Sequence, residues 1–593
     1  MRLRPVPVLL VVGVASVGAG IPIVSVRAAA PRVLRVGTWR GSTGTYSSIQ
    51  AAVDAAHAGD WVLVGPGDWK ERGDRTTHKP ASGEAGWGVT IEKPGLHVRG
   101  MNRNTVVVDG TRPGTPKCSS KAADQDFGST SAGRDGIVAY KVDGVSIENL
   151  TACNYLGQGN EIWWNGGDGS GKVGMGAYHG AYLNATTTYY GGASKPQATY
   201  GIFVSNARGP GLITRTYASN MNDASYYIGA CPDCNAVLDR AWAENSALGY
   251  SGTNSGGHLR IQNSEWDDNQ SGIVTNSQNN DDAPSPQVGL CPGSTTTSCE
   301  IWSNNYVHDN NNPNVPQSGS AGAGPVGTGM VIAGGRHDTL VHNLIVRNKA
   351  WGILTTPYPD TEVPPSAIGQ HCQGGEPNFD LSALGLTGTV PCYFSDWGNE
   401  IAHNTFTDNG GYGNPTNGDV GDISQPPPED PSATGNCWHD NTDTSGTFTE
   451  SPSTLSTTNG SCPAAGWPSV NAAEESVLIA EVACDSQLLF PCNPPPGVPA
   501  SYPQTTTVRL KPLPTARLAT MPNPCAGVPV NPWCPAASSS GGGSGGGGSG
   551  SAQGRGTGGS LSDTGLAVAI PLTALGLLAA GGVAVTIRRR NAA

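Results

Sequence analysis

Apolar residues recur along the middle of the chain in staggered series. The first series takes the apolar or small residue that follows a glycine or an aromatic residue, and it comprises Ile137, Ile202, Ile228, Ser251, Ile273, Met330 and Ile353. The second series trails the first by 10 or 11 residues where no insertion intervenes, and it comprises Ile147, Ile213, Leu238, Ile261, Ile301, Leu340 and Ile401. Five residues later stand Ala152, Ala218, Ala243, Trp266, Tyr306, Ile345 and Phe406. Short strands with inward-facing side chains are therefore predicted in every repeat.

The length of the repeat indicates the architecture. Without insertions the first series advances by 22 to 26 residues, with glycine turns and no helical pattern between the strands. Such a repeat cannot bury its apolar face alone, so successive repeats must stack into a solenoid. Leucine-rich repeats have a similar period, but their leucine consensus is missing. We therefore predict an all-β parallel β-helix, with Asn304, Asn343 and Asn404 stacked as a ladder of amides at one turn.

The segment before the repeats is predicted to cap the solenoid. Ser47 and Gln50 have the spacing of a weak capping box at the start of a short amphipathic helix. The apolar face of this helix consists of Ile49, Ala52, Val53 and Ala56. Strand-like runs follow at 61–64, 89–91, 96–99 and 106–109. A helix in this place would cover the open end of the first coil.

This N-terminal part carries a resemblance to a known group of proteins. The similar stretches are YSSIQAAVDAAHAGDWVLVGPGDWKE (46–71) and VTIEKPGLHVRGMNRNTVVVDG (89–110). They resemble the opening coils of the right-handed β-helix proteins of the pectin-lyase-like superfamily, and with the repeats the resemblance covers roughly residues 45–440. It implies the fold but no single activity, because that superfamily contains lyases, hydrolases, epimerases, adhesins and metal-pathway accessory proteins.

The sequence patterns at the two ends of the chain predict that the protein is exported and attached to the membrane. Residues 1–30 have the layout of a secretory signal peptide, with two arginines near the start, a long apolar run and a stretch of alanines. A retained N-terminal anchor is the alternative. Residues 566–587 are 22 residues without a charge, and a basic tail, 588–593, follows them. This order predicts a transmembrane helix with the bulk of the chain outside and a cytoplasmic tail.

A sorting-type pentapeptide precedes the predicted span. Residues 561–565, Leu-Ser-Asp-Thr-Gly, resemble the Leu-Pro-x-Thr-Gly signal of Gram-positive surface proteins, including actinobacterial variants. Ser562 stands where that signal has proline, so attachment to the wall by a sortase and a plain membrane anchor both stay open. Residues 538–560 are predicted to be a disordered Gly/Ser linker. The β-helix domain is assigned to 31–440, and 441–537 are a Pro-, Ser-, Thr- and Cys-rich capping or stalk region with a short helix at 472–483.

Composition and charge narrow the range of partners. Glycine (84) and proline (46) are frequent and only 13% of the 593 residues are charged, which excludes a helical bundle or a coiled coil. The net charge is −12, and it becomes more negative when the terminal arginines are left out, so the surface repels nucleic acid. We expect no nucleic-acid partner, no required cofactor, and membrane contact through one C-terminal helix. No pattern indicates the oligomeric state.

The 14 cysteines of an exported chain predict disulfides rather than a metal site. Pairing each cysteine with its neighbour gives Cys118–Cys153, Cys231–Cys234, Cys291–Cys299, Cys372–Cys392, Cys437–Cys462, Cys484–Cys492 and Cys525–Cys534. The spacing of Cys231 and Cys234 also matches a redox motif. The βαβ context of such a motif is missing, so a structural bridge is preferred there.

A column of charged residues supplies candidate chemistry. Seven residues into the second strand, successive repeats carry Asn154, Asn220, Asn245, Asp268, His308, Arg347 and Asp408. If the register holds, the last four lie about 5 Å apart, with Asp309 beside them. They could form an acid/base group in which His308 or Arg347 exchanges a proton while an aspartate assists or binds a cation. The alternative is a ladder of amides that ends in self-paired, solvated charges.

A long segment between two repeats, 157–199, is rich in aromatic residues. Aromatic faces commonly hold sugar rings, and the candidate substrate contacts are Trp163, Trp164, Tyr178 and Tyr182. A tyrosine-rich coil that packs on itself is the alternative. The insertions that follow Ile273 and Ile353 would project from one edge of the coils and form a wall beside them.

No complete catalytic motif of the superfamily is present. A polygalacturonase-like site needs a Gly-His-Gly before its Arg-x-Lys, and although residues 347–349 supply the latter, the former is missing. The Asp-Pro-His-Asp motif of alginate epimerases is also absent from the sequence. Pectate-lyase-like enzymes use calcium, and a similar site could be imitated by Asp267, Asp268, Asp281 and Asp282 with Arg336 or Arg347. Calcium is therefore a possible ligand, but no metal site is assigned.

These observations leave three functions open. We expect a β-helix protein at the extracellular face of the membrane or on the cell wall that engages a polysaccharide or a cell-envelope glycan. A noncatalytic surface, adhesion or spacer protein is the alternative. A polysaccharide lyase or glycoside hydrolase is the second alternative, because the resemblance includes such enzymes.

Overall fold

The structure is a computed structural model that describes residues 30–72, 86–128, 133–192, 197–279, 300–363, 371–384, 388–428, 430–468, 472–486 and 501–536. The chain divides into two units, Met1–Pro31 and Arg32–Ala593, and the elements below belong to the second. Nearly all of the predicted signal peptide, and the whole of the predicted linker, pentapeptide, span and tail, lie outside the described residues. Within the described ranges, no helix combines the length and the apolar character needed to span a membrane.

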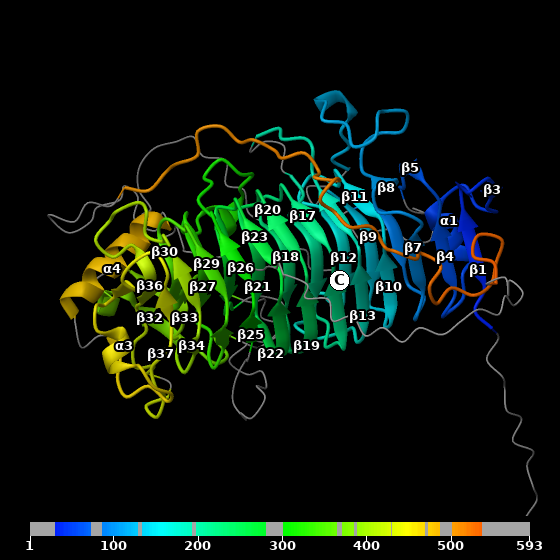
Figure 1. Ribbon diagram of the computed structural model, residues 1–593. Helices are drawn as coiled ribbons and strands as arrows, with labels where there is room; N and C mark the ends of the chain where they lie inside the picture. Colours follow the sequence, from blue (N-terminus) through cyan, green and yellow to red (C-terminus); the bar gives the residue numbers. More distant parts are fainter. Residues whose placement is uncertain are drawn as a thin grey trace, which may run out of the picture. The chain divides into compact units, whose positions relative to one another are not determined.

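Three long parallel sheets form the body of this unit (Figure 1). Sheet I has 12 strands in the order β1 (Val33–Val36), β4 (Trp61–Val64), β7 (His97–Gly100), β10 (Val145–Glu148), β13 (Tyr178–Ala181), β16 (Gly211–Thr214), β19 (Cys231–Asp239), β22 (Ser255–Gln262), β25 (Glu300–Ser303), β28 (Thr339–Val341), β34 (Glu400–Ala402) and β37 (Cys437–His439). Sheet II has 11 strands, β5 (Gly67–Trp69), β8 (Val106–Asp109), β11 (Thr151–Cys153), β14 (Asn184–Thr186), β17 (Tyr217–Ser219), β20 (Trp242–Glu244), β23 (Glu265–Asp267), β26 (Tyr306–His308), β29 (Leu344–Val346), β35 (Thr405–Thr407) and β38 (Thr442–Asp443). Sheet III also has 11, β6 (Gly86–Ile91), β9 (Arg134–Tyr140), β12 (Asn160–Asn165), β15 (Tyr200–Ser205), β18 (Ala224–Gly229), β21 (Leu248–Thr253), β24 (Ser271–Asn276), β27 (Thr328–Ala333), β30 (Trp351–Thr356), β36 (Gly418–Asp422) and β39 (Glu450–Ser451).

The chain visits sheets I, II and III in turn and then begins the next coil, as β10, β11, β12 and β13 show. This course is a parallel β-helix, as the repeats predict. Its right-handedness stays a prediction, which agrees with the general rule for parallel crossover connections.

The smaller elements lie at the ends and corners of the coils. They are the antiparallel pair β2 (Thr38–Trp39) and β3 (Ser42–Thr43), the antiparallel sheet of β31 (Tyr358–Asp360), β33 (Thr389–Phe394) and β32 (Glu376–Asp380), helices α1 (Ile49–Ala55), α2 (Gly319–Gly322), α3 (Leu455–Thr458) and α4 (Ala472–Asp485), and 3-10 turns at Ala122–Asp124 and Leu381–Leu384. Helix α4 covers the segment in which the sequence predicts a short helix.

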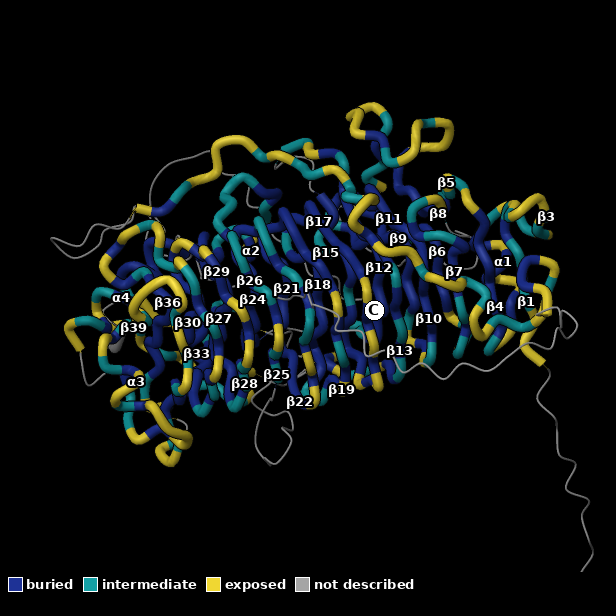
Figure 2. The backbone as a smooth tube through the Cα atoms, in the orientation of Figure 1, coloured by how far each residue is buried: buried dark blue, intermediate teal, exposed yellow. Residues whose placement is uncertain are grey.

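The core lies between the three sheets, where each strand points one row of side chains inward. Buried residues accordingly predominate along the strands of the coils (Figure 2). The inward row of sheet I runs through Ile147, Ile213, Leu238, Ile261, Trp302, Leu340, Ile401 and Trp438. The inward row of sheet III runs through Ile137, Ile162, Ile202, Tyr226, Tyr250, Ile273, Met330 and Ile353. All of these side chains are buried. Burial of stacked apolar rows is what holds the coils together.

The predicted register is wrong by one residue after the insertion that follows Ile273. Ile301 pairs with Thr339, and it is Trp302 that pairs with Leu340 and faces the core. The shift continues along the coil, so Val307 rather than Tyr306 is inward. Neighbouring residues of similar type make both registers acceptable to a pattern search, and the insertion (280–299) lies outside the described residues.

Two further rows in sheet III differ from the prediction. Tyr250, not Ser251, pairs with Ile273, and Tyr226 rather than Ile228 is in register with Ile202. Ile228 is two residues further along the same strand, so it keeps the inward parity and is buried as well. The segment 157–199 is also a complete coil, formed by β12, β13 and β14, rather than an excursion.

Asparagine ladders occupy two corners of the coils. One is the predicted ladder, with Asn305 in place of Asn304, and the other is additional. The corner between sheets I and II holds Asn305, Asn343, Asn404 and Asn441, and the corner between sheets II and III holds Asn269, Asn310, Asn348 and Asn409. The amide oxygens of Asn343, Asn404, Asn441, Asn348 and Asn409 accept from the backbone N–H of the asparagine in the preceding coil, as in the bond from Asn343 N to Asn404 Oδ1 (3.0 Å). The side-chain amide of Asn269 donates to Asn310 Oδ1 at 3.0 Å. The ladders therefore satisfy backbone groups that the turns would otherwise bury without a partner.

Helix α1 covers the first coil, as predicted, but its N-terminal cap differs. Ser48 rather than Ser47 is the capping residue, and its hydroxyl accepts from Ala51 N–H at 3.2 Å. The Glu71 carboxylate accepts from Ile49 N–H at 2.6 Å and thereby replaces the predicted capping box. The apolar face of the helix packs on the first coils.

A C-terminal segment without helix or strand, residues 501–536, lies along the outside of the coils (orange in Figure 1). We call this segment the strap. It begins beside the last coils, where the ring of Tyr502 lies 6.1 Å from that of Trp351. It ends at the first coils, where Trp533 Nε1 donates to the carbonyl of Ser42 (2.9 Å). The strap therefore runs back along the β-helix, from the last coils to the first.

The predicted disulfides are confirmed wherever both cysteines are described. These bridges are Cys118–Cys153, Cys231–Cys234, Cys372–Cys392, Cys437–Cys462 and Cys525–Cys534. The pairs Cys291–Cys299 and Cys484–Cys492 include residues outside the described ranges. All the confirmed bridges are local, as nearest-neighbour pairing requires.

Candidate functional site on the outer face of sheet II

The short strands of sheet II place two outward rows of side chains beside each inward residue. In four successive coils the row before the inward residue holds Tyr217, Trp242, Glu265 and Tyr306, and the row after it holds Ser219, Glu244, Asp267 and His308. Stacked strands lie about 4.8 Å apart, so these side chains are direct neighbours. We call this surface the sheet II site.

Carboxylates of the site are hydrogen-bonded to its aromatic residues. Trp242 Nε1 donates to Asp267 Oδ1 at 2.7 Å, and the Tyr217 hydroxyl donates to Glu244 Oε1 at 2.8 Å. Burial raises the pKa of Asp267 to about 6, against the opposing effect of the nearby His308. Asp267 therefore changes its protonation state close to neutral pH, as a general acid or base must.

His308 is held between carboxylates. Its Nδ1 lies 2.9 Å from Asp309 Oδ2, its Nε2 lies 3.7 Å from Glu265 Oε1, and its ring stacks on Tyr306 with centroids 3.9 Å apart. Burial alone would lower the pKa of His308, but the hydrogen bond to Asp309, the nearby Glu265 carboxylate and the charge of Asp267 outweigh it and raise the pKa to about 9. The imidazole is therefore cationic at neutral pH.

Arg347 forms a two-point ion pair with Asp309. Arg347 Nε lies 2.9 Å from Asp309 Oδ1, and Nη2 lies 2.5 Å from Oδ2. Burial would raise the pKa of Asp309, but its bonds to His308 and Arg347 lower it to about 2. Asp309 is thus a permanent anion that orients two cations at the edge of the site.

The predicted charged column is correct in part. Asp268, Asp309, Arg347 and Asp408 occupy equivalent corner positions, with φ of 54°, 53°, 53° and 55°. His308 precedes this column by one residue and belongs to the outward row of sheet II, because of the register shift described above. The structure brings His308, Asp309 and Arg347 together. The backbone N–H of Asp408 donates to Ser445 Oγ (2.9 Å) in the following coil.

The predicted aromatic contacts lie away from this surface. Trp164 and Tyr178 are buried in the core, so they offer no face to a sugar. Trp163 is also buried and stacks on Phe203 with centroids 4.8 Å apart. The ring of Tyr182 lies under the Arg215 guanidinium. The pattern of aromatic residues in this segment arises because it is a coil that packs on its neighbours.

The strap covers one end of the site. Lys511 Nζ contacts the Glu244 carboxylate and lies 2.8 Å from Asp268 Oδ2. The Arg517 guanidinium lies 4.0 Å from the centre of the Trp242 ring. Leu513 and Leu518 pack against the Tyr217 and Trp242 rings. Asn220 and Asn245 fix the strap by donating to the carbonyls of residues 511 and 509 at 2.9 and 2.8 Å.

The sequence did not point to Tyr217, Trp242, Glu244 or Glu265. They could have been found as the residues on either side of the inward positions Ala218, Ala243 and Trp266. The sequence does not reveal that the strap residues Lys511 and Arg517 belong to the site, because no repeat links them to the coils that they contact.

The calcium candidates are only partly brought together. Asp267, Asp268 and Arg347 border the sheet II site, whereas Asp281 and Asp282 lie outside the described residues. Arg336 lies at another corner, where its Nη2 donates to the Gly374 carbonyl at 2.7 Å. Donor atoms of Glu265, Asp267 and His308 do lie within 4.8 Å of one another. A cationic His308 disfavours a metal ion there, because a protonated imidazole is no ligand.

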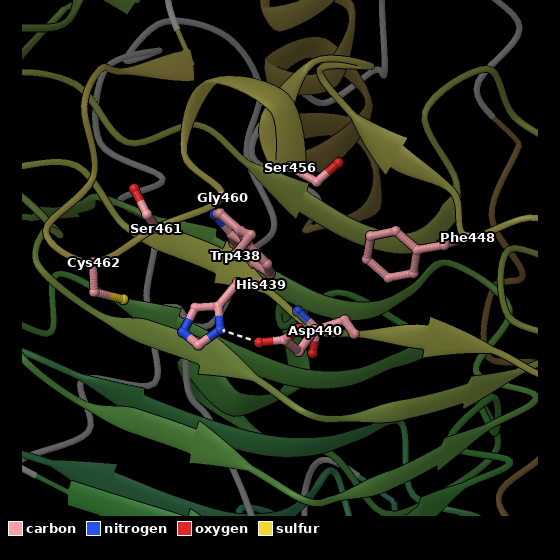
Figure 3. Close-up of a pocket in the computed structure, with 9 residues that line it drawn as sticks. Trp438, His439, Asp440, Phe448, Ser456, Gly460, Ser461 and Cys462 are labelled. Atoms are coloured by element: carbon pink, nitrogen blue, oxygen red, sulfur yellow. Dashed lines mark hydrogen bonds and ion pairs between the residues drawn. The ribbon is translucent and has the colours of Figure 1, made fainter.

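A separate cavity of about 530 Å³ lies at the C-terminal end of the coils (Figure 3). It is lined by Trp438, His439, Asp440, Asn441, Phe448, Ser456, Gly460, Ser461 and Cys462. Figure 3 shows His439 and Asp440 joined by a hydrogen bond, with Phe448 to one side of Asp440. This cavity shares no residue with the sheet II site.

No known protein family and no curated protein matches this chain. Several solved structures are similar to it. One is the A-module of mannuronan C-5 epimerase AlgE4 of Azotobacter vinelandii, with 14% identity, coverage of 68% of this chain and 92% of that chain, and a TM-score of 0.38. A lacto-N-biosidase of Eubacterium ramulus has 10% identity, coverage of 70% of this chain and 64% of that chain, and a TM-score of 0.35. An alginate lyase of Paenibacillus sp. has 10% identity, coverage of 71% of this chain and 97% of that chain, and a TM-score of 0.28. The β-helix itself follows from the strand pairing of this chain.

Proposed function

We propose that this protein is an exported, envelope-tethered β-helix protein that binds carbohydrate at the sheet II site. The observation that carries the proposal is the side-by-side placement of Tyr306, Glu265, Asp267 and His308 on one outer face. An aromatic ring offers a flat apolar surface to the C–H face of a sugar, and charged groups beside it can bind hydroxyl groups. These residues lie beyond Trp242 along the face, and the strap reaches Glu265 through Arg517, whose Nη2 lies 3.5 Å from Glu265 Oε1.

A cleaving activity is the second candidate, favoured by the two carboxylates. Glu265 and Asp267 approach within 4.8 Å, and the raised pKa of Asp267, about 6, allows it to hold a proton in weakly acidic solution. Glycoside hydrolysis uses such a pair, in which the protonated member gives its proton to the leaving oxygen and the ionised member activates water or attacks. Such an activity would decline as the pH rises through about 6, because Asp267 then loses its proton.

Binding of the full-length protein to a panel of plant, algal and bacterial wall polysaccharides tests the first proposal. We expect Tyr306→Ala to abolish measurable binding. Tyr190→Ala is the matched control, because Tyr190 is an exposed tyrosine outside sheet II. A panel without any ligand, or equal loss in both variants, would refute carbohydrate binding at this site.

Product assays separate binding from cleavage. If the pair is catalytic, Asp267→Asn should lower the release of reducing ends by about 10²–10⁴-fold while binding stays within a few-fold. An unsaturated product that absorbs in the ultraviolet would indicate a lyase instead. Binding without any product would identify a noncatalytic adhesion or spacer protein.

The tether is proposed from the sequence of 561–593. The five local disulfides support an oxidising compartment outside the cytoplasm. Deletion of 561–593 should release the protein into the medium. In the intact protein, extraction by detergent would indicate a membrane anchor, whereas release only after digestion of the wall would indicate sortase attachment. A protein that stays inside the cell would overturn the proposal.

A further inference from the structure

A group of histidines lies where the last coils turn from sheet I to sheet II. His342, His403 and Asp440 occupy equivalent corner positions in successive coils, and His439 is the residue before Asp440. Corner positions have φ between 54° and 58° here, so their side chains project outward from the coils. Earlier coils place Tyr182, Arg215 and Arg240 at this corner.

The donor atoms of three of these residues converge. Asp440 Oδ2 lies 2.8 Å from His439 Nδ1 and 3.9 Å from His403 Nε2. One ligand atom from each residue lies within 4.8 Å of the other two. In a tetrahedral zinc site with bonds of about 2.1 Å, ligand atoms are roughly 3.4 Å apart. The separations of 2.8 and 3.9 Å bracket that value, and the exposed Asp440 carboxylate can close the remainder by rotation.

The surrounding residues have the arrangement that metal-bound histidines require. Glu400 Oε1 lies 3.4 Å from His439 Nε2, on the side of the ring away from Asp440. A carboxylate in this position fixes the tautomer and orientation of a metal-ligating histidine. The ring of His342 stacks on that of His403, with centroids 5.2 Å apart, and so restrains the second imidazole.

We propose that His403, His439 and Asp440 bind a divalent transition-metal ion of the zinc type. Two imidazoles and one carboxylate suit such an ion, whereas calcium prefers oxygen ligands throughout. Three protein ligands leave a coordination position open. His439 and Asp440 also line the cavity of about 530 Å³ in Figure 3, so the open position would be available to water or to a small oxygen-bearing ligand held there.

This site is independent of the sheet II site. It uses the corner beside sheet I in the last coils, and it shares no residue with Glu265, Asp267 or His308. The cysteines Cys437 and Cys462 nearby are joined in a disulfide and are not ligands. Metal binding here can therefore be tested whether or not the protein binds carbohydrate.

The test is titration of the full-length, untagged protein with Zn²⁺ by calorimetry after removal of metal with a chelator. We expect one saturable site per chain, which is lost in His403→Ala and in His439→Ala. Glu400→Gln should weaken the affinity by about 10–100-fold, since it removes only the orienting carboxylate. Co²⁺ substitution should give visible absorption bands of a four- or five-coordinate site, and these bands should disappear in the same variants.

His258→Ala is the matched control, because His258 Nδ1 lies 2.7 Å from Asp233 Oδ1 and forms an exposed histidine–aspartate pair without a second imidazole. Its removal should leave the titration unchanged. Circular dichroism of each variant establishes that the coils are intact. Absence of saturable binding in the wild type, or binding that survives the combined His403→Ala and His439→Ala change, would overturn the proposal.

Discussion

The ionisation of His308 is the sharpest consequence of the sheet II site. An isolated histidine titrates near pH 6.5, whereas the contacts with Asp309, Glu265 and Asp267 raise the pKa of His308 to about 9 despite burial. The perturbation that tests this reasoning is Asp309→Asn, which removes the carboxylate 2.9 Å from Nδ1 and leaves the shape of the site unchanged. We expect the pKa of His308 to fall by about one unit or more in this variant.

The same ionisation is coupled to folding. Each pKa unit corresponds to about 1.4 kcal/mol. The rise in the pKa of His308 from 6.5 to about 9 therefore means that its protonation adds about 3 kcal/mol to the free energy of unfolding. The folded-state pKa is raised, so this stability is fully present below pH 6.5 and is lost as the pH rises through 9. Only 13% of the His308 side chain is exposed, so solvent screens its contacts little.

The assay is NMR of the protein with isotope-labelled histidine, with the signal of His308 assigned from its absence in His308→Gln. Urea unfolding of wild type and His308→Gln at pH 6 and pH 10 measures the coupled stability. The difference between the two proteins should shrink by about 3 kcal/mol at the higher pH. His97 is an internal control, because burial lowers its pKa. A His308 that titrates at or below 6.5 would refute the electrostatic account of the site.

Three further predictions concern the strap, the ladders and the disulfides. Replacing Lys511 by Met together with Arg517 by Ala should increase glycan binding and the quenching of tryptophan fluorescence by acrylamide, and unchanged quenching would contradict the contacts described. Asn348→Ala should destabilise the protein by about 1–3 kcal/mol in denaturant unfolding, because it removes the acceptor of the buried Asn310 N–H and one donor to the Val307 carbonyl. Reduction of the disulfides should leave the β signal in circular dichroism intact, and its collapse at moderate temperature would show that the bridges hold the coils together.

The sequence predicts the coils well where the repeat is uninterrupted. Ile147, Ile213 and Leu238 face the core as the period requires, because every coil must bury the same side of its strand. After the insertion the prediction is wrong by one residue, since both Ile301 and Trp302 are suitable core residues. Only strand pairing with the following coil decides between them, and pairing is a tertiary interaction.

The site is less predictable than the fold. Asp309 and Arg347 are found from the sequence because they repeat with the coils. Lys511 and Arg517 reach the site from the strap, more than 200 residues further along the chain than the strands that they contact. No local pattern encodes such a contact, because it depends on the path of a segment without regular structure.

The charges of the site explain why the strap lies where it does. In a β-helix, successive coils place equivalent side chains about 4.8 Å apart, so carboxylates of adjacent coils repel each other unless a cation lies between them. His308 supplies that cation at one end of the outward row, and Lys511 supplies it at the other, between Glu244 and Asp268. A carbohydrate that extends along the row from Tyr306 would meet Lys511 and Arg517 and compete with them for the same carboxylates. The strap therefore sets how much of the sheet II site a ligand can occupy.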